Sequence, residues 1–275
     1  MEKYSVLMSV YKKEKPEYLK TAIDSMLFQT MIPDEIVIVK DGNLTPELDM
    51  VLEKYLNDQP EHFNIVGYEK NRGLGLALNY GLGKCKNQIV ARMDTDDIAL
   101  PDRCEKQLKM FEENKELEIV GGDIAEFVDV PTNIIAYRRV PTTDKSIKDY
   151  MKIRCPFNHM AVMFKKAAVI KAGNYQDWYC NEDYYLWIRM LEAKCVFSNI
   201  GDVLVNVRVG ADTYSRRGGK EYFTSEIKLQ KYMLDNNIIG YLRYILNVSK
   251  RVIIQRIFPN RIRFWVFRKF AREKI

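Results

Sequence analysis

The chain has 275 residues, of which 47% are hydrophobic and 29% charged, an ordinary globular composition that excludes disordered and collagen-like proteins. Its five cysteines include no CxxC pair, which argues against a disulfide framework or a zinc site and favours a reducing compartment. The first residues lack the apolar core of a signal peptide, and no stretch approaches 18 uncharged apolar residues. We therefore expect neither export nor a membrane span.

The net charge of +6 is concentrated at the C-terminal end of the sequence. Residues 241–275 contain ten basic residues and one acid, a net charge of +9, whereas the first 240 residues contain 33 basic and 36 acidic residues, a net charge of −3. A concentrated basic segment on a slightly acidic body is typical of a protein that binds an anionic surface.

The first hundred residues alternate between two hydrophobic periodicities. Buried strands are predicted over residues 4–10, 35–39, 63–68 and 88–93, and amphipathic helices over 16–29, 48–56 and 74–82. Such alternation predicts an α/β fold with a mainly parallel central sheet flanked by helices on both faces.

The alternation becomes less regular after residue 100. We predict a helix from Pro101 to Lys115, strands over 118–129, 134–140 and 160–164, helices over 165–172 and 182–193, and two short strands over 196–207 around Gly201 and Asp202. Beyond residue 218 the chain reads as helical, with an interruption at Pro259. The sequence thus divides into an α/β domain, residues 1–218, and a helical, basic amphipathic C-terminal extension, residues 219–275.

Polar residues follow each of the first four predicted strands. They are Tyr11, Lys40-Asp41-Gly42, Glu69-Lys70-Asn71-Arg72-Gly73, and Asp94-Thr95-Asp96-Asp97. Because ligands of open α/β sheets bind beyond the carboxyl ends of the strands, we expect these loops to form one site.

The sequence Ala91-Arg-Met-Asp-Thr-Asp-Asp97 ends a predicted strand with three carboxylates. A hard divalent cation, Mg²⁺ or Mn²⁺, that bridges to phosphate oxygens would relieve the repulsion between them. The alternative is a solvated acidic turn, but the position at the ligand-binding edge favours the metal site.

Five segments in a fixed order give the chain its resemblance to a known family: residues 5–11, 40–42, 71–75, 92–97 and 181–183. With them the chain resembles the family 2 glycosyltransferases, inverting enzymes with the GT-A fold, over residues 4–217. It looks closest to bacterial members that build capsule, exopolysaccharide or lipopolysaccharide units on a polyprenyl-diphosphate carrier at the inner face of the membrane. The resemblance implies that residues 1–218 form a GT-A catalytic domain with a Rossmann-like sheet.

The resemblance also assigns the donor site, for which a UDP-sugar is the expected ligand. It implies that Asp41 recognises the base, that Val10 and Tyr11 line the nucleotide pocket, and that Asp94 and Asp96 bind the ribose and a metal-bound diphosphate, with Asp97 left open. Lys40 stands where a second acid often precedes the aspartate. We place four further residues in the nucleotide-sugar site: Arg72, Gly73, Arg92 and Thr95. As alternatives, the two arginines are buried partners of the aspartates, and Gly73 belongs to a turn at a helix start.

Asp183 matches the carboxylate that serves as catalytic base in the family. A carboxylate that accepts the proton of a sugar hydroxyl in the transition state contributes about 10²–10⁴-fold to the rate. Glu182 and His159 are expected on the acceptor side, and Arg216 and Arg217, in the sequence SRRGG, suit a lid over the diphosphate. As alternatives, Glu182 and Asp183 merely occupy the N-terminus of a helix, His159 has a structural role, and Arg216 and Arg217 belong to a solvated run of charges.

The C-terminal segment interleaves apolar and aromatic residues with its basic ones, a pattern typical of helices that lie on anionic membranes. We expect this tail to hold the protein peripherally on the cytoplasmic face of the membrane, without nucleic-acid binding. The alternatives are packing of the tail on the body and nucleic-acid binding.

The expected activity is therefore a metal-dependent, inverting transfer of sugar to a lipid-linked saccharide in bacterial surface polysaccharide synthesis. A sugar nucleotidyltransferase is the second hypothesis, although YKKEKPEY replaces the glycine-rich, lysine-containing loop that such enzymes place after the first strand. A non-catalytic nucleotide-binding scaffold at the membrane is the third.

Overall fold

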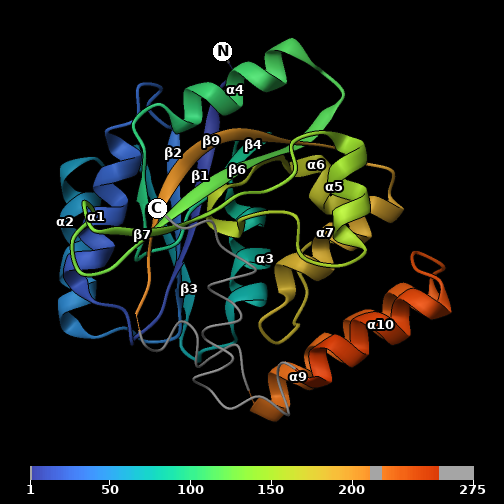
Figure 1. Ribbon diagram of the computed structural model, residues 1–275. Coiled ribbons are helices and arrows are strands. Elements are labelled where there is room, and N and C mark those ends of the chain that lie inside the picture. Colours follow the sequence, from blue (N-terminus) through green and yellow to red (C-terminus); the bar gives the residue numbers. More distant parts are fainter. Residues whose placement is uncertain (1, 211–218, 254–275) are drawn as a thin grey trace.

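The computed structural model describes residues 2–210 and 219–253 (Figure 1). The first half alternates strands and helices: β1 (Tyr4–Val10), α1 (Pro16–Leu27), β2 (Glu35–Asp41), α2 (Pro46–Asp58), β3 (Phe63–Tyr68), α3 (Leu74–Lys84) and β4 (Ile89–Arg92). The second half is less regular: β5 (Ile98–Ala99), α4 (Arg103–Glu113), β6 (Leu117–Phe127), β7 (Ile134–Arg138), α5 (Asp144–Met151), the 3₁₀ turn η1 (His159–Ala161), β8 (Met163–Lys165), α6 (Lys166–Lys171), α7 (Glu182–Glu192), β9 (Val196–Arg208), α9 (Gly219–Asp235) and α10 (Tyr241–Val252).

One mixed sheet joins the strands of the described residues, in the order β3-β2-β1-β4-β8-β6-β9-β5, with β7 beside β6. The pairs β1 with β2, β1 with β4 and β2 with β3 are parallel. Their carboxyl ends therefore meet at one edge of the molecule, which positions the loops after β1, β2 and β4 close together. The predicted α/β class is confirmed.

The parallel arrangement extends only through the first half of the sheet. β8 runs antiparallel to both β4 and β6, whereas β6 and β9 pair in parallel along nearly their whole length. The prediction of two short strands over 196–207 is wrong, because β9 is one strand whose pairing with β6 jumps from Ile200 to Val203. Gly201 and Asp202 thus form a bulge within a strand, and not a turn between two strands.

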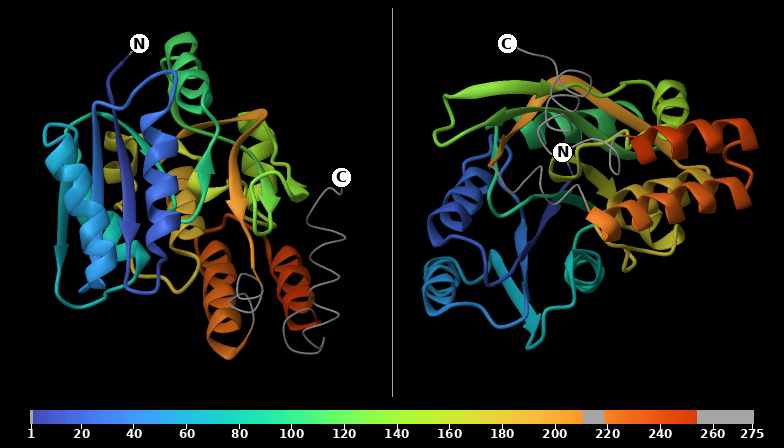
Figure 2. Two further views of the ribbon diagram at one scale, coloured as in Figure 1. Left: turned by 90° about the vertical axis from the view of Figure 1, so that its left-hand side faces the viewer. Right: turned by 60° about the horizontal axis from the view of Figure 1, so that its bottom comes forward.

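Two hydrophobic clusters lie on opposite faces of the sheet. One is formed with side chains of α1, α2 and α4, such as Leu19, Leu48 and Leu108, and the other with side chains of α3, α6 and α7, such as Leu78, Val169 and Trp187. Figure 2 (right) shows β1 to β3 between α1 and α2 on one side and α3 on the other. The apolar runs of β1 and β2 are buried on both faces, as their sequences predict, whereas β3, at the end of the strand order, is only partly buried.

Two elements were not predicted. The first is the two-residue strand β5, which is too short to have a periodicity. The second is helix α5, which begins with a capping box in which the Thr143 hydroxyl accepts a hydrogen bond from the Ser146 main-chain N–H.

Helices α9 and α10 lie side by side at the edge of the molecule toward which β1 points (Figure 2, left). Leu229 and Met233 of α9 are fully buried in the second hydrophobic cluster, so this helix packs on the α/β domain. Within residues 2–210 and 219–253, no helix combines the length and hydropathy that a membrane span requires.

Candidate active site

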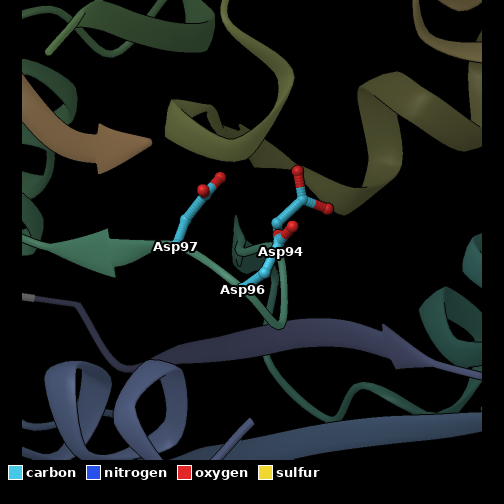
Figure 3. A group of neighbouring side chains, drawn as sticks. All are labelled: Asp94, Asp96 and Asp97. Atoms are coloured by element: carbon cyan, nitrogen blue, oxygen red, sulfur yellow. The ribbon is translucent and has the colours of Figure 1, made fainter. Parts of the chain in front are cut away.

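Three carboxylates meet in the loop between β4 and β5. Asp94, Asp96 and Asp97 each bring a carboxylate oxygen to within 4.8 Å of the others, and their side chains extend to the same side of the loop (Figure 3). Carboxylate oxygens are the ligands that Mg²⁺ and Mn²⁺ prefer. The predicted metal-binding pair is thus brought together, and Asp97, which the sequence left open, lies with it.

The carboxylate cluster is electrostatically strained. Burial, followed by the negative charges of Asp94 and Glu14, raises the pKa of Asp96 to about 7. Burial, followed by the charges of Asp96 and Asp94, raises the pKa of Asp97 above its usual range. A divalent cation at this position would compensate the repulsion and favour the ionised carboxylates, so the donor set fits such an ion.

Protein groups partly neutralise the cluster from two directions. The Nη2 group of Arg92 lies 2.5 Å from Asp94 Oδ1, and the Arg208 main-chain N–H donates to Asp97 Oδ1 at 2.9 Å. Arg92 is only 1% exposed, and its Nε and Nη1 groups have no hydrogen-bond partner among the described residues. Arg92 is therefore a buried partner of the aspartates, which is the alternative given for it above.

Thr95, expected at the nucleotide, is buried within the same loop. Its hydroxyl donates to Glu14 Oε2 at 2.7 Å and so ties the loop after β4 to the loop after β1. The side chain of Val10, at the end of β1, lies in the hydrophobic core, whereas the adjacent Tyr11 is 37% exposed. Of these two predicted pocket residues, only Tyr11 therefore presents its side chain at the surface.

The loop after β2 is organised around Asp41. The Asp41 carboxylate accepts hydrogen bonds from Asn71 Nδ2 at 2.9 Å, from the Arg72 N–H at 2.7 Å and from the Gly73 N–H at 3.1 Å. Asp41 is buried and fixes the loop that precedes α3. Gly42 approaches the same loop so closely that an added Cβ would lie 2.7 Å from the Asn71 nitrogen.

The other predicted members of this loop also have defined positions. Gly73 is the N-cap of α3 with φ near 91°, so it belongs to a turn at a helix start. The Arg72 side chain is exposed, and its guanidinium carbon lies 5.2 Å from the centre of the Tyr68 ring.

A second acidic group, Glu182 and Asp183, begins helix α7. Burial, followed by the charge of Asp183, raises the pKa of Glu182 to about 8, and burial also raises the pKa of Asp183. The positive charge of Arg92 opposes both shifts. Because Asp94 also acts on Glu182, the two acidic groups share one electrostatic environment around Arg92.

His159 lies on η1 and is buried beside this second group. Its Nε2 is 3.0 Å from the Tyr175 hydroxyl, and its ring packs against Trp187 at 6.0 Å. Burial, followed by the charge of Arg92, lowers the pKa of His159 well below its usual range, which keeps the ring neutral. These contacts are those of a structural histidine, which is the alternative given for His159 above.

Several residues of the site were missed from the sequence. Arg208 reaches Asp96 and Asp97 from the end of β9, more than a hundred residues away, and the Cys155 thiol donates to Asp183 Oδ2 at 3.7 Å. The one available signal was the position of Arg208 directly after a predicted strand. Arg216 and Arg217, the predicted lid residues, lie outside the described residues.

A mixed α/β sheet with an acidic loop after its fourth strand, and a second acidic pair facing it, defines the class of GT-A glycosyltransferases. Comparison with solved structures confirms this fold. Staphylococcus aureus TarS (residues 1–349) in complex with UDP-GlcNAc aligns with a TM-score of 0.65 over 98% of this chain and 76% of that one, at 16% identity. The mannosyltransferase PcManGT from Pyrobaculum calidifontis, in complex with GDP-Man and Mn²⁺, aligns with a TM-score of 0.61 over 93% and 70%, at 14% identity. The chain spans 44% of a longer TarS structure, with a TM-score of 0.66.

The sequence comparisons identify the family. The model of glycosyl transferase family 2 matches residues 5–169. The UDP-Gal:alpha-D-GlcNAc-diphosphoundecaprenol beta-1,3-galactosyltransferase of Escherichia coli is 38% identical over 98% of this chain and 97% of its own length. The amylovoran biosynthesis glycosyltransferase AmsE of Erwinia amylovora is 39% identical over 97% and 98%. The chain therefore belongs to glycosyltransferase family 2, and the predicted family is confirmed.

Proposed function

We propose that this glycosyltransferase moves a hexose from a UDP-sugar to a hydroxyl of a lipid-linked saccharide, with inversion, in bacterial surface polysaccharide synthesis. The observation that carries the proposal is that two acidic groups interact with the same buried Arg92, one with the donor set for a divalent cation and one with a candidate base. The names of the similar proteins, which include UDP-Gal, UDP-GlcNAc and diphosphoundecaprenol, support this choice of substrates.

On the donor side, Asp94 and Asp96 would hold Mn²⁺ or Mg²⁺, with Asp97 beside them. The cation supplies positive charge for the departing diphosphate. The ion pair with Arg92 holds the Asp94 side chain in the cluster. Asp41 and the loop of Asn71 to Gly73 form the wall toward which the nucleoside would lie.

On the acceptor side, Asp183 would accept the proton of the acceptor hydroxyl as its oxygen attacks the anomeric carbon. The new glycosidic bond forms on the face opposite the diphosphate while the bond to the diphosphate breaks. The raised pKa of Asp183 makes the carboxylate a better proton acceptor than an exposed aspartate. Glu182, with a pKa of about 8, would be neutral at pH 7 and could hydrogen-bond the acceptor sugar without adding a second negative charge.

We further propose that residues 1–218 form the catalytic domain and that the basic extension, residues 219–275, holds it at the inner face of an anionic membrane. Tyr241, Leu242, Ile245 and Leu246 of α10 are exposed, which supports this role. Sedimentation with phosphatidylglycerol vesicles tests it. The full chain should pellet and a chain ending at Val252 should pellet less, whereas equal pelleting of the two would contradict a membrane role for the basic tail.

The central test of the proposed function is thermal unfolding with UDP, GDP, CDP or ADP, each with and without Mn²⁺. A ligand at a hundredfold excess over its Kd stabilises the native state by about 2.7 kcal/mol. We expect a Mn²⁺-dependent shift with UDP for the wild type that Asp96→Asn abolishes, followed by transfer from one of a panel of UDP-sugars. The absence of a shift with every nucleotide would argue against the donor site.

A further inference from the structure

Helix α10 is exposed along most of its surface but has one buried polar anchor. Asn247 is the only buried residue of the helix and is 2% exposed, whereas the adjacent Leu246 is 46% exposed. The Asn247 Nδ2 group donates to the Lys152 carbonyl at 2.9 Å and to Gln230 Oε1 of α9 at 2.8 Å. A buried amide is costly unless it is bonded, so this contact fixes α10 in one position against residue 152.

One turn further along α10, Arg251 makes a second contact with the same segment. Its Nη2 group donates to the Ile153 carbonyl at 3.4 Å, and its Nε group pairs with Glu226 of α9. The side chains of Arg251 and Glu226 are both largely buried, which strengthens the pair relative to a surface ion pair. The α9–α10 pair thus holds two consecutive carbonyls, those of Lys152 and Ile153.

Residues 152–158, here called the base loop, are also held at their other end. Arg138 of β7 donates to the Cys155 carbonyl at 2.8 Å, to the Phe157 carbonyl at 3.1 Å and to Asn158 Oδ1 at 2.8 Å. Three bonds from one planar guanidinium restrict the loop in orientation as well as in distance. The base loop is therefore clamped between the sheet and α10.

The base loop also contacts the candidate base, Asp183. Among the described residues, the Cys155 thiol is the one side chain that donates a hydrogen bond to the Asp183 carboxylate, with the sulfur 3.7 Å from Oδ2. The Phe157 carbonyl, 3.5 Å from the same sulfur, is the second acceptor for the thiol proton. A thiol is a weak donor, so it can orient a carboxylate while leaving most of its affinity for a proton.

We propose that α10 is a positioning element for the catalytic base, acting through Asn247 and Arg251 on the base loop and through Cys155 on Asp183. The inference rests on the proposed role of Asp183. It gives the C-terminal helix a task in catalysis that is separate from membrane binding, since the anchor is on the buried side of α10 and the exposed apolar residues are not part of it.

The direction of the pH effect follows from the groups around Asp183. Transfer needs the ionised Asp183 carboxylate, so activity is lost as the pH falls through the pKa of Asp183. Burial raises this pKa, and the hydrogen bond from the Cys155 thiol lowers it. Removing that donor should move the acid limb of the pH profile to higher pH, and a serine hydroxyl should restore it. The other groups that act on Asp183 or feel its charge are Arg138, Arg92, Glu182 and Tyr175.

The experiment compares Asn247→Ala and Cys155→Ala with the matched control Ser249→Ala, at an exposed polar position of the same helix, in the full chain. The substrates are UDP-galactose and a synthetic α-GlcNAc-diphospho-lipid, and UDP affinity with Mn²⁺ reports on folding. We expect kcat to fall about ten- to a hundredfold in Asn247→Ala and Cys155→Ala, with the KM for UDP-galactose unchanged. The acid limb should move upward in Cys155→Ala and return in Cys155→Ser, and Ser249→Ala should match the wild type.

A second readout does not need turnover. Amide hydrogen exchange of residues 152–158 should become faster in Asn247→Ala and remain unchanged in Ser249→Ala. Unchanged exchange in the base loop, or an unchanged kcat and acid limb in both Asn247→Ala and Cys155→Ala while Asp183→Asn is inactive, would overturn the inference and leave the proposed function intact. Full activity of Asp183→Asn would instead remove the proposed base.

Discussion

The two acidic groups of this glycosyltransferase are held in different ways. Asp94, Asp96 and Asp97 come from one short loop and crowd their carboxylate oxygens within 4.8 Å, with Arg92 and the Arg208 N–H as partial compensation. Glu182 and Asp183 are sequence neighbours at the start of a helix, and Asp183 is oriented by a thiol from a clamped loop. Burial raises pKa values in both groups, but only the first group has the donor set of a cation site.

This difference shows how one sheet edge can separate two chemical tasks. A cluster of crowded carboxylates, whose repulsion a cation would relieve, can bind a metal diphosphate, whereas a buried carboxylate keeps a raised proton affinity although the Tyr184 main chain and the Cys155 thiol lower it. Variants of the first group should therefore lose UDP binding, whereas variants of the second group should lose turnover.

The largest expected effect comes from Asp183→Asn. An amide cannot accept the proton of the acceptor hydroxyl, so kcat should fall by about 10²–10⁴-fold. The Mn²⁺-dependent affinity for UDP should remain, because Asp183 is not part of the carboxylate cluster that would hold the cation. Isothermal titration with UDP and a transfer assay on the same preparation check both halves of this prediction, and a parallel loss of UDP binding would mean that the two groups are not separable.

The alternation of strands and helices through β4 could be predicted because each element carries its own periodicity, and the acidic segments could be placed because they directly follow a buried strand or begin an amphipathic helix. Arg208, Cys155 and the anchor Asn247 could not be predicted. Each acts through a contact that spans 28 to 111 residues of sequence, and such contacts depend on packing that no local pattern encodes.

A change confined to the donor side should leave the base untouched. Gly42 has φ near 89°, and an added Cβ would lie 2.7 Å from the Asn71 nitrogen, so Gly42→Ala must displace the loop that Asp41 holds. We expect a loss of about 2 kcal/mol in the free energy of unfolding and weaker UDP binding. The acid limb of the pH profile, which reports Asp183, should not move, and denaturant unfolding with a pH series measures both quantities. A shift of that limb would show that strain passes from the donor loop to the base.

The smallest effect is expected for Glu182→Gln. The pKa of Glu182 is about 8 in the folded chain, above the ordinary value of 4.5. The stability that its protonated form contributes is present at low pH and is lost as the pH rises toward 8, where the buried side chain ionises next to Asp183. Glutamine keeps the neutral form at every pH, so the free energy of unfolding of Glu182→Gln should exceed that of the wild type at pH 9, and the difference should be much smaller at pH 5.

At pH 7 the wild-type Glu182 is already mostly neutral, so transfer by Glu182→Gln should remain within about tenfold of the wild type, against the far larger loss in Asp183→Asn. Urea unfolding at pH 5 and pH 9, with Asp183→Asn as the matched carboxyl-to-amide control, tests this assignment. Equal stabilities of Glu182→Gln and wild type at both pH values, or a loss of activity as large as that of Asp183→Asn, would place a permanent negative charge on Glu182 and make it part of the base.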